Sequence, residues 1–229
     1  MTIDIHSSEG RGITKADWLE SRHSFSFAEY HNPQKTNFGK LLVLNEDYIA
    51  PGFGFGMHPH ANMEIITIVL QGMLYHEDSL GNKAKIIPGE IQRMSAGKGI
   101  IHSEINPGKR KTHLLQIWIE PEIKNINPDY EQKKITFQKN ELLPIVSGTQ
   151  NAPLYMHQKA TLFLGLFMKG KSFNYALPKN QGVYCFVIDG KVKINNTTLK
   201  QGDAAAITEE NIEGTSLEHS HILLFEVPL

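Results

Sequence analysis

Two short pairs of residues are the side chains best suited to chemistry in this sequence. The first pair is His58 and His60, separated by a proline, and the second is His102 and Glu104, separated by a serine. Side chains alternate between the two faces of a β-strand, so the members of each pair point the same way if each segment is a strand. Imidazole and carboxylate groups together suit a divalent first-row metal. If the two faces converge, the sequence predicts a metal site of three histidines and one glutamate.

Glycine-rich turns precede both pairs. Gly52, Gly54 and Gly56 come before the first pair, and residues 88–99 carry three glycines and a proline before the second. Glycine permits tight turns and close backbone approach, so each pair is expected to be entered from a sharp bend. Between the pairs, residues 63–70 are rich in β-branched side chains and are followed by a glycine turn. This pattern predicts a buried strand.

Composition places the chain among ordinary globular proteins. Its 229 residues, 40% of them hydrophobic, are enough for one or two domains with a core. The formal net charge of -1 gives no basic field for nucleic acid or for an anionic membrane. Cys185 is the only cysteine, which excludes an intramolecular disulfide. The N-terminus lacks the pattern of a signal peptide, and no apolar run reaches the roughly 20 residues of a membrane span. We expect a cytoplasmic, soluble protein.

Short apolar segments recur along the whole chain and are punctuated by glycine and proline. This cadence is typical of an all-β barrel or sandwich. Residues 120–133 are polar and contain prolines, and they are the best candidate for a boundary. One exception to the strand pattern is residues 14–19, where Thr14 is expected to cap a short helical turn.

The second half of the chain echoes the first. Residues 187–191 resemble residues 69–73, and each segment carries a glycine turn. Counting from the matching glycines predicts that four residues occupy the places of the metal ligands, and none of them binds metals: Ala176, Pro178, Thr215 and Leu217. The second half is therefore expected to be a duplicated barrel without a site.

Several motifs, in order and at fixed spacing, resemble the pirin family of bicupins. Residues 52–72 resemble the first cupin motif, and residues 89–106 resemble the second, although both are longer than the general pattern. The departures match the pirin branch, as do residues 76–82, His23-Ser24-Phe25-Ser26-Phe27 and Gln116-Ile117-Trp118. The resemblance is dense over about residues 10–120 and is only an outline beyond them.

The resemblance implies an all-β chain of two cupin, jelly-roll-type β-barrel domains. These would be a metal-binding cupin at 1–120, a linker at 121–134 and a degenerate cupin without metal at 135–229. Members of the family hold one divalent metal through three histidines and a glutamate, which here implies His58, His60, His102 and Glu104. Iron is the metal expected, with Mn, Ni, Co, Cu or Zn as alternatives. Glu64 is a ligand in cupins with the general motif but not in this branch.

Two functions are compatible with this resemblance. In the first, the protein is a quercetin 2,3-dioxygenase that cleaves a flavonol with O2 and releases carbon monoxide. Glu104 would accept the proton of the substrate hydroxyl, and Phe53 and Phe55 would offer an apolar mouth for a flat ring. In the second, the protein is a non-enzymatic, metal- or redox-dependent regulator that binds a protein partner. A zinc isomerase of the cupin type ranks third.

Other polar residues have simpler interpretations. His76 and Asp78 are expected to serve mainly turn chemistry on a hairpin. His113 has a smaller chance of facing the barrel near Gln116, behind the metal ligands. Cys185 lies between aromatic residues and is expected to be buried and inert.

Overall fold

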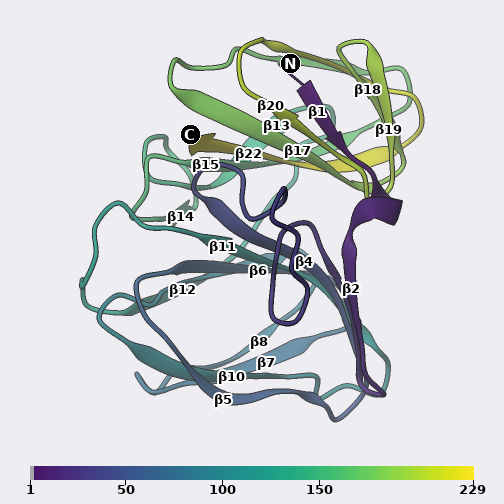
Figure 1. Cartoon of the computed structure of the whole chain (residues 1–229). Helices are drawn as coiled ribbons and strands as arrows, with labels where there is room; N and C mark the ends of the chain where they lie inside the picture. Colours follow the sequence, from purple (N-terminus) through teal and green to yellow (C-terminus); the bar gives the residue numbers. More distant parts are fainter. Residues whose placement is uncertain (1–2) are drawn as a thin grey trace.

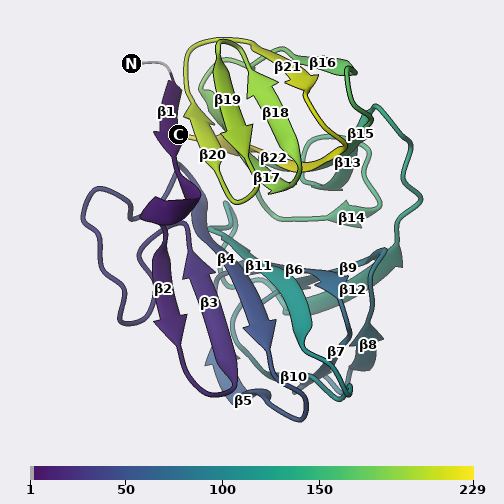
Figure 2. The same cartoon turned by 90° about the vertical axis from the view of Figure 1, so that its right-hand side faces the viewer.

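The computed structural model describes residues 3–229, and over that range the strands form four sheets in two stacked units (Figure 1, Figure 2). Each unit pairs a seven-stranded sheet with a four-stranded sheet. The expected all-β fold with two jelly-roll-type units is confirmed. The sheets are separate in the described chain and do not join into one hydrogen-bonded barrel. A short 3-10 helix, Ser8–Gly10, lies between strands β1 (Ile3–His6) and β2 (Gly12–Lys15).

The first unit carries both histidine pairs. Its large sheet has the order β12 (Asp129–Lys134), β9 (Glu90–Ser95), β6 (Glu64–Gln71), β11 (Thr112–Ile119), β4 (Leu41–Ile49), β3 (Leu19–His23), β2 (Gly12–Lys15). Its small sheet has the order β5 (Gly54–His60), β10 (Ile100–Ile105), β7 (Leu74–Asp78), β8 (Lys83–Ile86). The predicted buried strand at 63–70 is confirmed as β6.

The second unit repeats this arrangement. Its large sheet has the order β1 (Ile3–His6), β20 (Ala204–Ile207), β17 (Gln181–Asp189), β22 (Ser220–Pro228), β15 (Thr161–Phe167), β13 (Leu142–Ser147), β14 (Leu154–Tyr155). Its small sheet has the order β16 (Ser172–Tyr175), β21 (Ile212–Ser216), β18 (Lys191–Ile194), β19 (Thr197–Lys200).

The edge strands tie the two units together. Strand β1, at the start of the chain, pairs with β20 of the second unit before the chain crosses into the first (Figure 2). Strand β12, which follows β11 along the chain, returns to pair with β9 at the edge of the first large sheet. Part of the segment expected to be a linker is therefore a strand of the first large sheet. The domain limits expected from the sequence remain a prediction. The structure shows that β1, from the start of the chain, completes the large sheet of the second unit, and that β12 completes that of the first.

The two large sheets pack against each other through one apolar core. Ile66 of β6 and Ile117 of β11 lie in it with Phe186 of the second unit. Complete burial of such side chains is worth about 1.5–3 kcal/mol each. Residues of the opposite parity, such as Thr67 and Gln116, point to the other face, where they contact Glu104 of the small sheet. Strand alternation thus gives β6 and β11 one face for the core between the units and one for the site.

The helical turn expected at residues 14–19 is wrong. Thr14 belongs to β2, and the backbones of Ala16 and Leu19 exchange hydrogen bonds that close a hairpin to β3. Strand β3 extends the large sheet beside β4, where Leu19 is buried with Ile49. Pairing and burial outweigh the local capping signal. In residues 3–229, no helix has the length and apolar character to cross a membrane.

Candidate metal centre

Neighbouring strands of the first small sheet bring the predicted ligands to one face. Strand β10 lies between β5 and β7. His102 is directly opposite His58 on β5, and Glu104 is directly opposite His76 on β7. The side chains of Ile100, His102 and Glu104 are buried, whereas Ile101, which lies between the first two, is exposed. The alternation predicted from the spacing is therefore present on β10.

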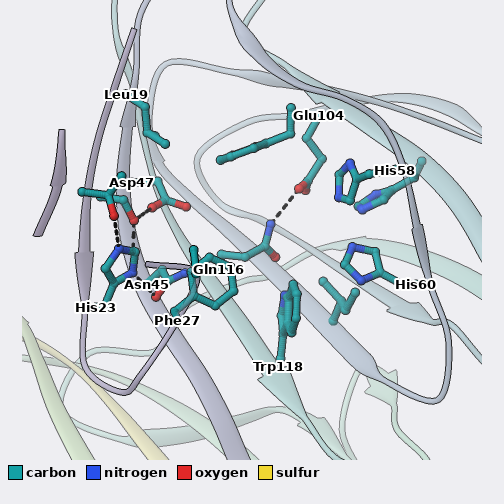
Figure 3. Close-up of a pocket in the computed structure, with 16 residues that line it drawn as sticks. Leu19, His23, Phe27, Asn45, Asp47, His58, His60, Glu104, Gln116 and Trp118 are labelled. Carbon is teal, nitrogen blue, oxygen red and sulfur yellow. Dashed lines mark hydrogen bonds between the residues drawn. The ribbon is translucent and has the colours of Figure 1, made fainter. Parts of the chain in front are cut away.

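The three predicted histidines meet at one point. The ring centroids of His58 and His102 lie 4.4 Å apart, those of His58 and His60 4.8 Å, and those of His60 and His102 5.0 Å. One ring nitrogen from each lies within 4.8 Å of the other two, a spacing that can hold a metal ion. Figure 3 shows His58 and His60 side by side at one end of a cavity.

One hydrogen bond and one unpartnered nitrogen indicate which ring nitrogens would face a metal. Nδ1 of His58 donates to the backbone carbonyl of Gly56 at 2.7 Å, which leaves its Nε2 as the free lone pair. Nε2 of His102 is buried and finds no hydrogen-bond partner among the residues described. A buried imidazole nitrogen without a partner is costly. A metal ion at the centre of the three rings would relieve this cost, so the donor set fits a divalent metal.

The half-buried ring of His60 and the buried ring of His102 are both kept neutral. Burial, together with the nearby charge of His58, lowers the pKa of His60 to about 4. Burial and the neighbouring histidines lower the pKa of His102 to about 2. Neutral imidazoles offer lone pairs at physiological pH, so a metal would have no proton to displace from either ring.

Glu104 belongs to a second, overlapping group. Its carboxylate accepts a hydrogen bond from Nε2 of Gln116 at 2.7 Å (Figure 3). It accepts a second hydrogen bond from Oγ1 of Thr67 at 3.2 Å. Its oxygen comes within 4.8 Å of ring nitrogens of His76 and His102, but the group formed by His58, His60 and His102 does not include it. Burial, and secondarily the charge of Asp47, raises the pKa of Glu104 to about 7. The role of Glu104 as fourth ligand remains a prediction.

His76 and Asp78 lie beside the histidine cluster, and Asp78 also serves the turn chemistry expected of it. Asp78 does hold the turn, because Oδ1 accepts the backbone N–H groups of Leu80 and Asn82 at 2.9 Å and 3.0 Å. Its other oxygen lies 2.9 Å from Nε2 of His76, and Nδ1 of His76 lies 3.4 Å from Nδ1 of His102. The signal in the sequence was the spacing: His76 and Asp78 are two residues apart, as both predicted ligand pairs are.

The cavity beside the histidines is mainly apolar. It has a volume of about 170 Å³. Its lining combines aromatic and aliphatic side chains with a polar far end: Phe27, Phe55, Ile65 and Trp118, then His23, Asn45 and Asp47. Phe55 is half-buried against Trp18, whereas Phe53 is 55% exposed and is outside the lining. Phe55 alone fits the predicted apolar mouth.

The polar far end is internally satisfied. His23 is buried, with Nδ1 2.8 Å from Oδ1 of Asn45 and Nε2 2.8 Å from Oγ1 of Thr14. Asp47 accepts a short hydrogen bond from Ser21, and burial raises its pKa to about 6. Figure 3 places these residues across the cavity from His58 and His60, with Gln116 between.

Two further polar residues lie away from the cavity. Glu64 is buried, but it contacts Ser95 and His157, so it is not placed with the three histidines. His113 does not face the cavity: its ring stacks on Tyr48 and its Nε2 lies 2.9 Å from Glu46. The idea that His113 stands behind the ligands near Gln116 is therefore wrong, because the two are three residues apart on β11 and a strand has period two.

The register of the second unit corrects the count made from its glycines. Gly214 pairs with Ile194 as Glu104 pairs with His76, and Ile212 pairs with Tyr175 as His102 pairs with His58. The equivalents of the four predicted ligands are thus Tyr175, Leu177, Ile212 and Gly214. The count from the glycines was one residue off for the first pair and three residues off for the second, and an odd shift along a strand moves a side chain to the other face.

Comparison with known proteins identifies two domains that correspond to the two units. The Pirin family model matches residues 6–119, and the model of the quercetinase C-terminal cupin domain matches residues 144–227. A protein named quercetin 2,3-dioxygenase from Escherichia coli (strain K12) is 38% identical over 228 residues, covering 99% of each chain.

Solved structures agree with the fold. The bacterial pirin YhhW from Escherichia coli, in complex with nickel(II), superposes with a TM-score of 0.94 at 39% identity and covers 99% of both chains. A quercetin 2,3-dioxygenase from Acinetobacter baumannii superposes with a TM-score of 0.79 at 20% identity, covering 99% of this chain and 79% of that one, which shows the fold alone. With two cupin domains in one chain, this protein belongs to the pirin family.

Proposed function

We propose that the protein is a mononuclear metal-dependent dioxygenase that cleaves flavonols such as quercetin. The observation that carries this proposal is the convergence of three imidazoles, one with a buried and unpartnered Nε2 within residues 3–229, at the end of an apolar cavity. The names of full-length relatives support the same activity. Both atoms of O2 would enter the product, and one ring carbon would leave as carbon monoxide.

His58, His60 and His102 would hold the metal, with Glu104 as the fourth ligand. A divalent metal there would act as a Lewis acid toward an oxygen of the substrate and lower the pKa of its hydroxyl group. The nitrogen and oxygen donors suit several first-row ions. Iron is the ion we propose, and nickel, which the related YhhW binds in its crystal structure, is an alternative.

Glu104 would accept the proton of the substrate hydroxyl. Burial raises its pKa to about 7, so this carboxylate holds a proton more tightly than an exposed glutamate does. Gln116 and Thr67 hold the carboxylate from the large sheet, so the proton acceptor has a fixed position. To act as a ligand beside His58 and His60, the carboxylate would have to leave these two partners, because it lies with His76 and His102 instead.

The cavity walls suit a flat aromatic substrate. Trp118 lines the cavity and meets His60 edge to face, with ring centroids 4.9 Å apart. Phe27 packs on Trp118 at 5.4 Å. These rings offer apolar faces for a planar ligand and keep bulk water from the polar groups.

Oxygen uptake with quercetin tests the proposal. Protein reconstituted separately with Fe, Mn, Ni, Co, Cu and Zn should show metal-dependent uptake matched by release of carbon monoxide. The His102→Ala variant should lose both. The Ser103→Ala variant, altered at the next residue of β10, is the matched control and should retain both. Full turnover in His102→Ala, or stoichiometric metal without uptake for every ion, would contradict the proposal.

A further inference from the structure

We propose that Asp78 and His76 form a relay that fixes the orientation and the tautomer of His102 and so presents its Nε2 to the metal. This inference rests on the proposed metal site. It assigns a positioning role to two buried residues that the ligand set does not include.

The three groups form a continuous line across two adjacent strands. Nε2 of His76 lies 2.9 Å from Oδ2 of Asp78, and Nδ1 of His76 lies 3.4 Å from Nδ1 of His102. The side chains of His76 and Asp78 are 0% exposed, and His102 is 1% exposed. Water therefore does not compete for these contacts, and each ring must find its partners in the protein.

The order of protons along the line follows from its end. A carboxylate only accepts, so Nε2 of His76 carries the proton that faces Asp78. A neutral imidazole has one N–H, so Nδ1 of His76 is an acceptor. Nδ1 of His102 then donates to it, and Nε2 of His102 is left with a free lone pair. That Nε2 is the buried atom for which residues 3–229 supply no hydrogen-bond partner.

Asp78 is itself held from two sides. Its Oδ1 accepts from the backbone of Leu80 and of Asn82, and the side-chain amide of Asn82 reaches Oδ2 at 3.0 Å. Tyr130 of β12 packs on the other side of His76, with ring centroids 4.7 Å apart. The turn at residues 78–82 and the returning strand β12 thus fix the first two members of the relay, which fix the third.

The second unit provides an internal comparison. Ile194 stands opposite Gly214 there, in the register that His76 and Glu104 have in the first unit. The unit whose ligand positions are filled by apolar or aromatic side chains has an apolar residue in place of His76. A His–Asp pair needed only for the fold would serve both units equally, so the pair is connected with the histidine ligands. A competing interpretation is that His76 binds the metal directly together with His102 and Glu104.

The first measurement is independent of metal and of activity. Nitrogen-15 NMR of the metal-free protein should show His102 as the Nδ1–H tautomer and His76 as the Nε2–H tautomer. In His76→Leu, the His102 ring should lose its single tautomer. Finding His102 as the Nε2–H tautomer in the native protein would overturn the relay, even if the protein proves to be an active dioxygenase.

The second measurement is nickel(II) affinity by competition with a chelator. His76→Leu should bind about 10- to 100-fold more weakly, as for losses of groups that orient ligands. His76→Gln, whose amide can donate to Asp78 and accept from His102, should restore most of the affinity, and Ser103→Ala should match the native protein. Equal affinity in all of them would overturn the relay. Zinc can be added while the His76 Nδ1 resonance is followed. If that resonance moves to the position of a nitrogen bound directly to metal, His76 is a ligand and the relay is overturned. If no metal binds, the proposed function fails, but the tautomers still test the relay.

Discussion

The two units share a strand order but differ in what fills them. In the first unit, one row of aligned residues across the large sheet is polar; in the second, the row at the same register is apolar. The polar row is Gln92, Thr67, Gln116 and Asn45, and the apolar row is Ala205, Cys185, Leu224 and Phe163. Seven of these eight side chains are at most 5% exposed, and Gln116 is 7% exposed, so both rows lie inside the protein.

The small sheets differ in the same way. Gly214 takes the place of Glu104, and a Cβ added to it would lie 2.1 Å from the ring of Phe173. Phe173 therefore occupies the space that the glycine leaves, against Phe167 at a centroid distance of 4.7 Å. In the first unit, the inward carboxylate of Glu104 borders the cavity instead.

This difference indicates that the interior of the first unit contains buried polar groups that lower its stability and that a site can use. The interior of the second unit is closed mainly by hydrophobic packing, and the one carboxyl group of β22 on that face, Glu226, accepts a hydrogen bond from the hydroxyl of Tyr175. The interior of the first buries three carboxyl groups. Those of Asp47 and Glu104 have pKa values raised by burial, and that of Asp78 is paired with His76. Buried polar groups cost stability unless they are paired, and such costs are typical of functional sites. The predictions below test each side of this contrast.

Phe173→Ala should have the largest effect on stability. Removing the ring opens a cavity in the apolar unit and should lower the free energy of unfolding by about 3 to 5 kcal/mol, as measured by urea denaturation. Phe53→Ala, at a position that is 55% exposed, should cost much less. Nickel(II) binding by folded Phe173→Ala should equal that of the native protein. A loss of metal affinity would show that the two interiors are coupled and would break the comparison.

Gln116→Leu replaces a residue of the polar row in the first unit with leucine, the residue at the aligned position, Leu224, in the apolar row of the second unit. It removes the donor at 2.7 Å that holds the carboxylate of Glu104. We expect kcat for quercetin to fall about 10- to 100-fold, because the proton acceptor loses its fixed position. Gln150→Leu, on an exposed loop of the second unit, controls for the type of substitution. An unchanged kcat would mean that the polar row has no part in the reaction.

Asp47→Asn tests the cost of a buried carboxyl group. The pKa of Asp47 is raised by burial to about 6 in the folded protein. Between about pH 4 and pH 6 the folded state holds this proton more tightly than the unfolded state, so the contribution of Asp47 to stability falls as pH rises through that range. The variant should therefore gain about 2 kcal/mol relative to the native protein between pH 4 and pH 7. Thermal unfolding at both pH values measures the difference.

Glu46→Gln is the matched control with the opposite sign. Burial alone would raise the pKa of Glu46, but the hydrogen bond from His113 and the charge of Arg11 lower it to about 2. Its stabilising contribution is present above the unfolded pKa and is lost as pH falls toward 2, so Glu46→Gln should lose stability at pH 7. If both variants change stability in the same direction at pH 7, the pairing of Glu46 with His113 and Arg11 is not what separates the two carboxyl groups.

Alternation and spacing were enough to predict much of this molecule. The all-β fold follows from the short apolar segments, and the shared face of His102 and Glu104 follows from period two. The positions of Glu104 and His76 relative to one another did not follow, because pairing of β10 with β7 joins residues far apart in the sequence. The pairing of β1 with β20 is of the same kind. The sequence of each of these strands does not indicate which strand it will pair with. The pairing is therefore visible only in the assembled sheets.

Cys185→Thr places a polar residue of the first unit's row, that of Thr67, in the apolar row of the second unit. It should have the smallest effect on stability. Cys185 aligns with Thr67, is completely buried, and has a thiol pKa raised by burial to about 12. A hydroxyl there would meet Ala205 and Leu224 on the adjacent strands rather than a carboxylate and an amide. Cys185→Val has the same shape as Cys185→Thr without the hydroxyl, so the difference between the two isolates that group. We expect Thr to be less stable than Val by about 1 kcal/mol in urea denaturation. Equal stability would mean that the second interior tolerates polar atoms, and its lack of a polar row would then need an explanation other than the cost of burial.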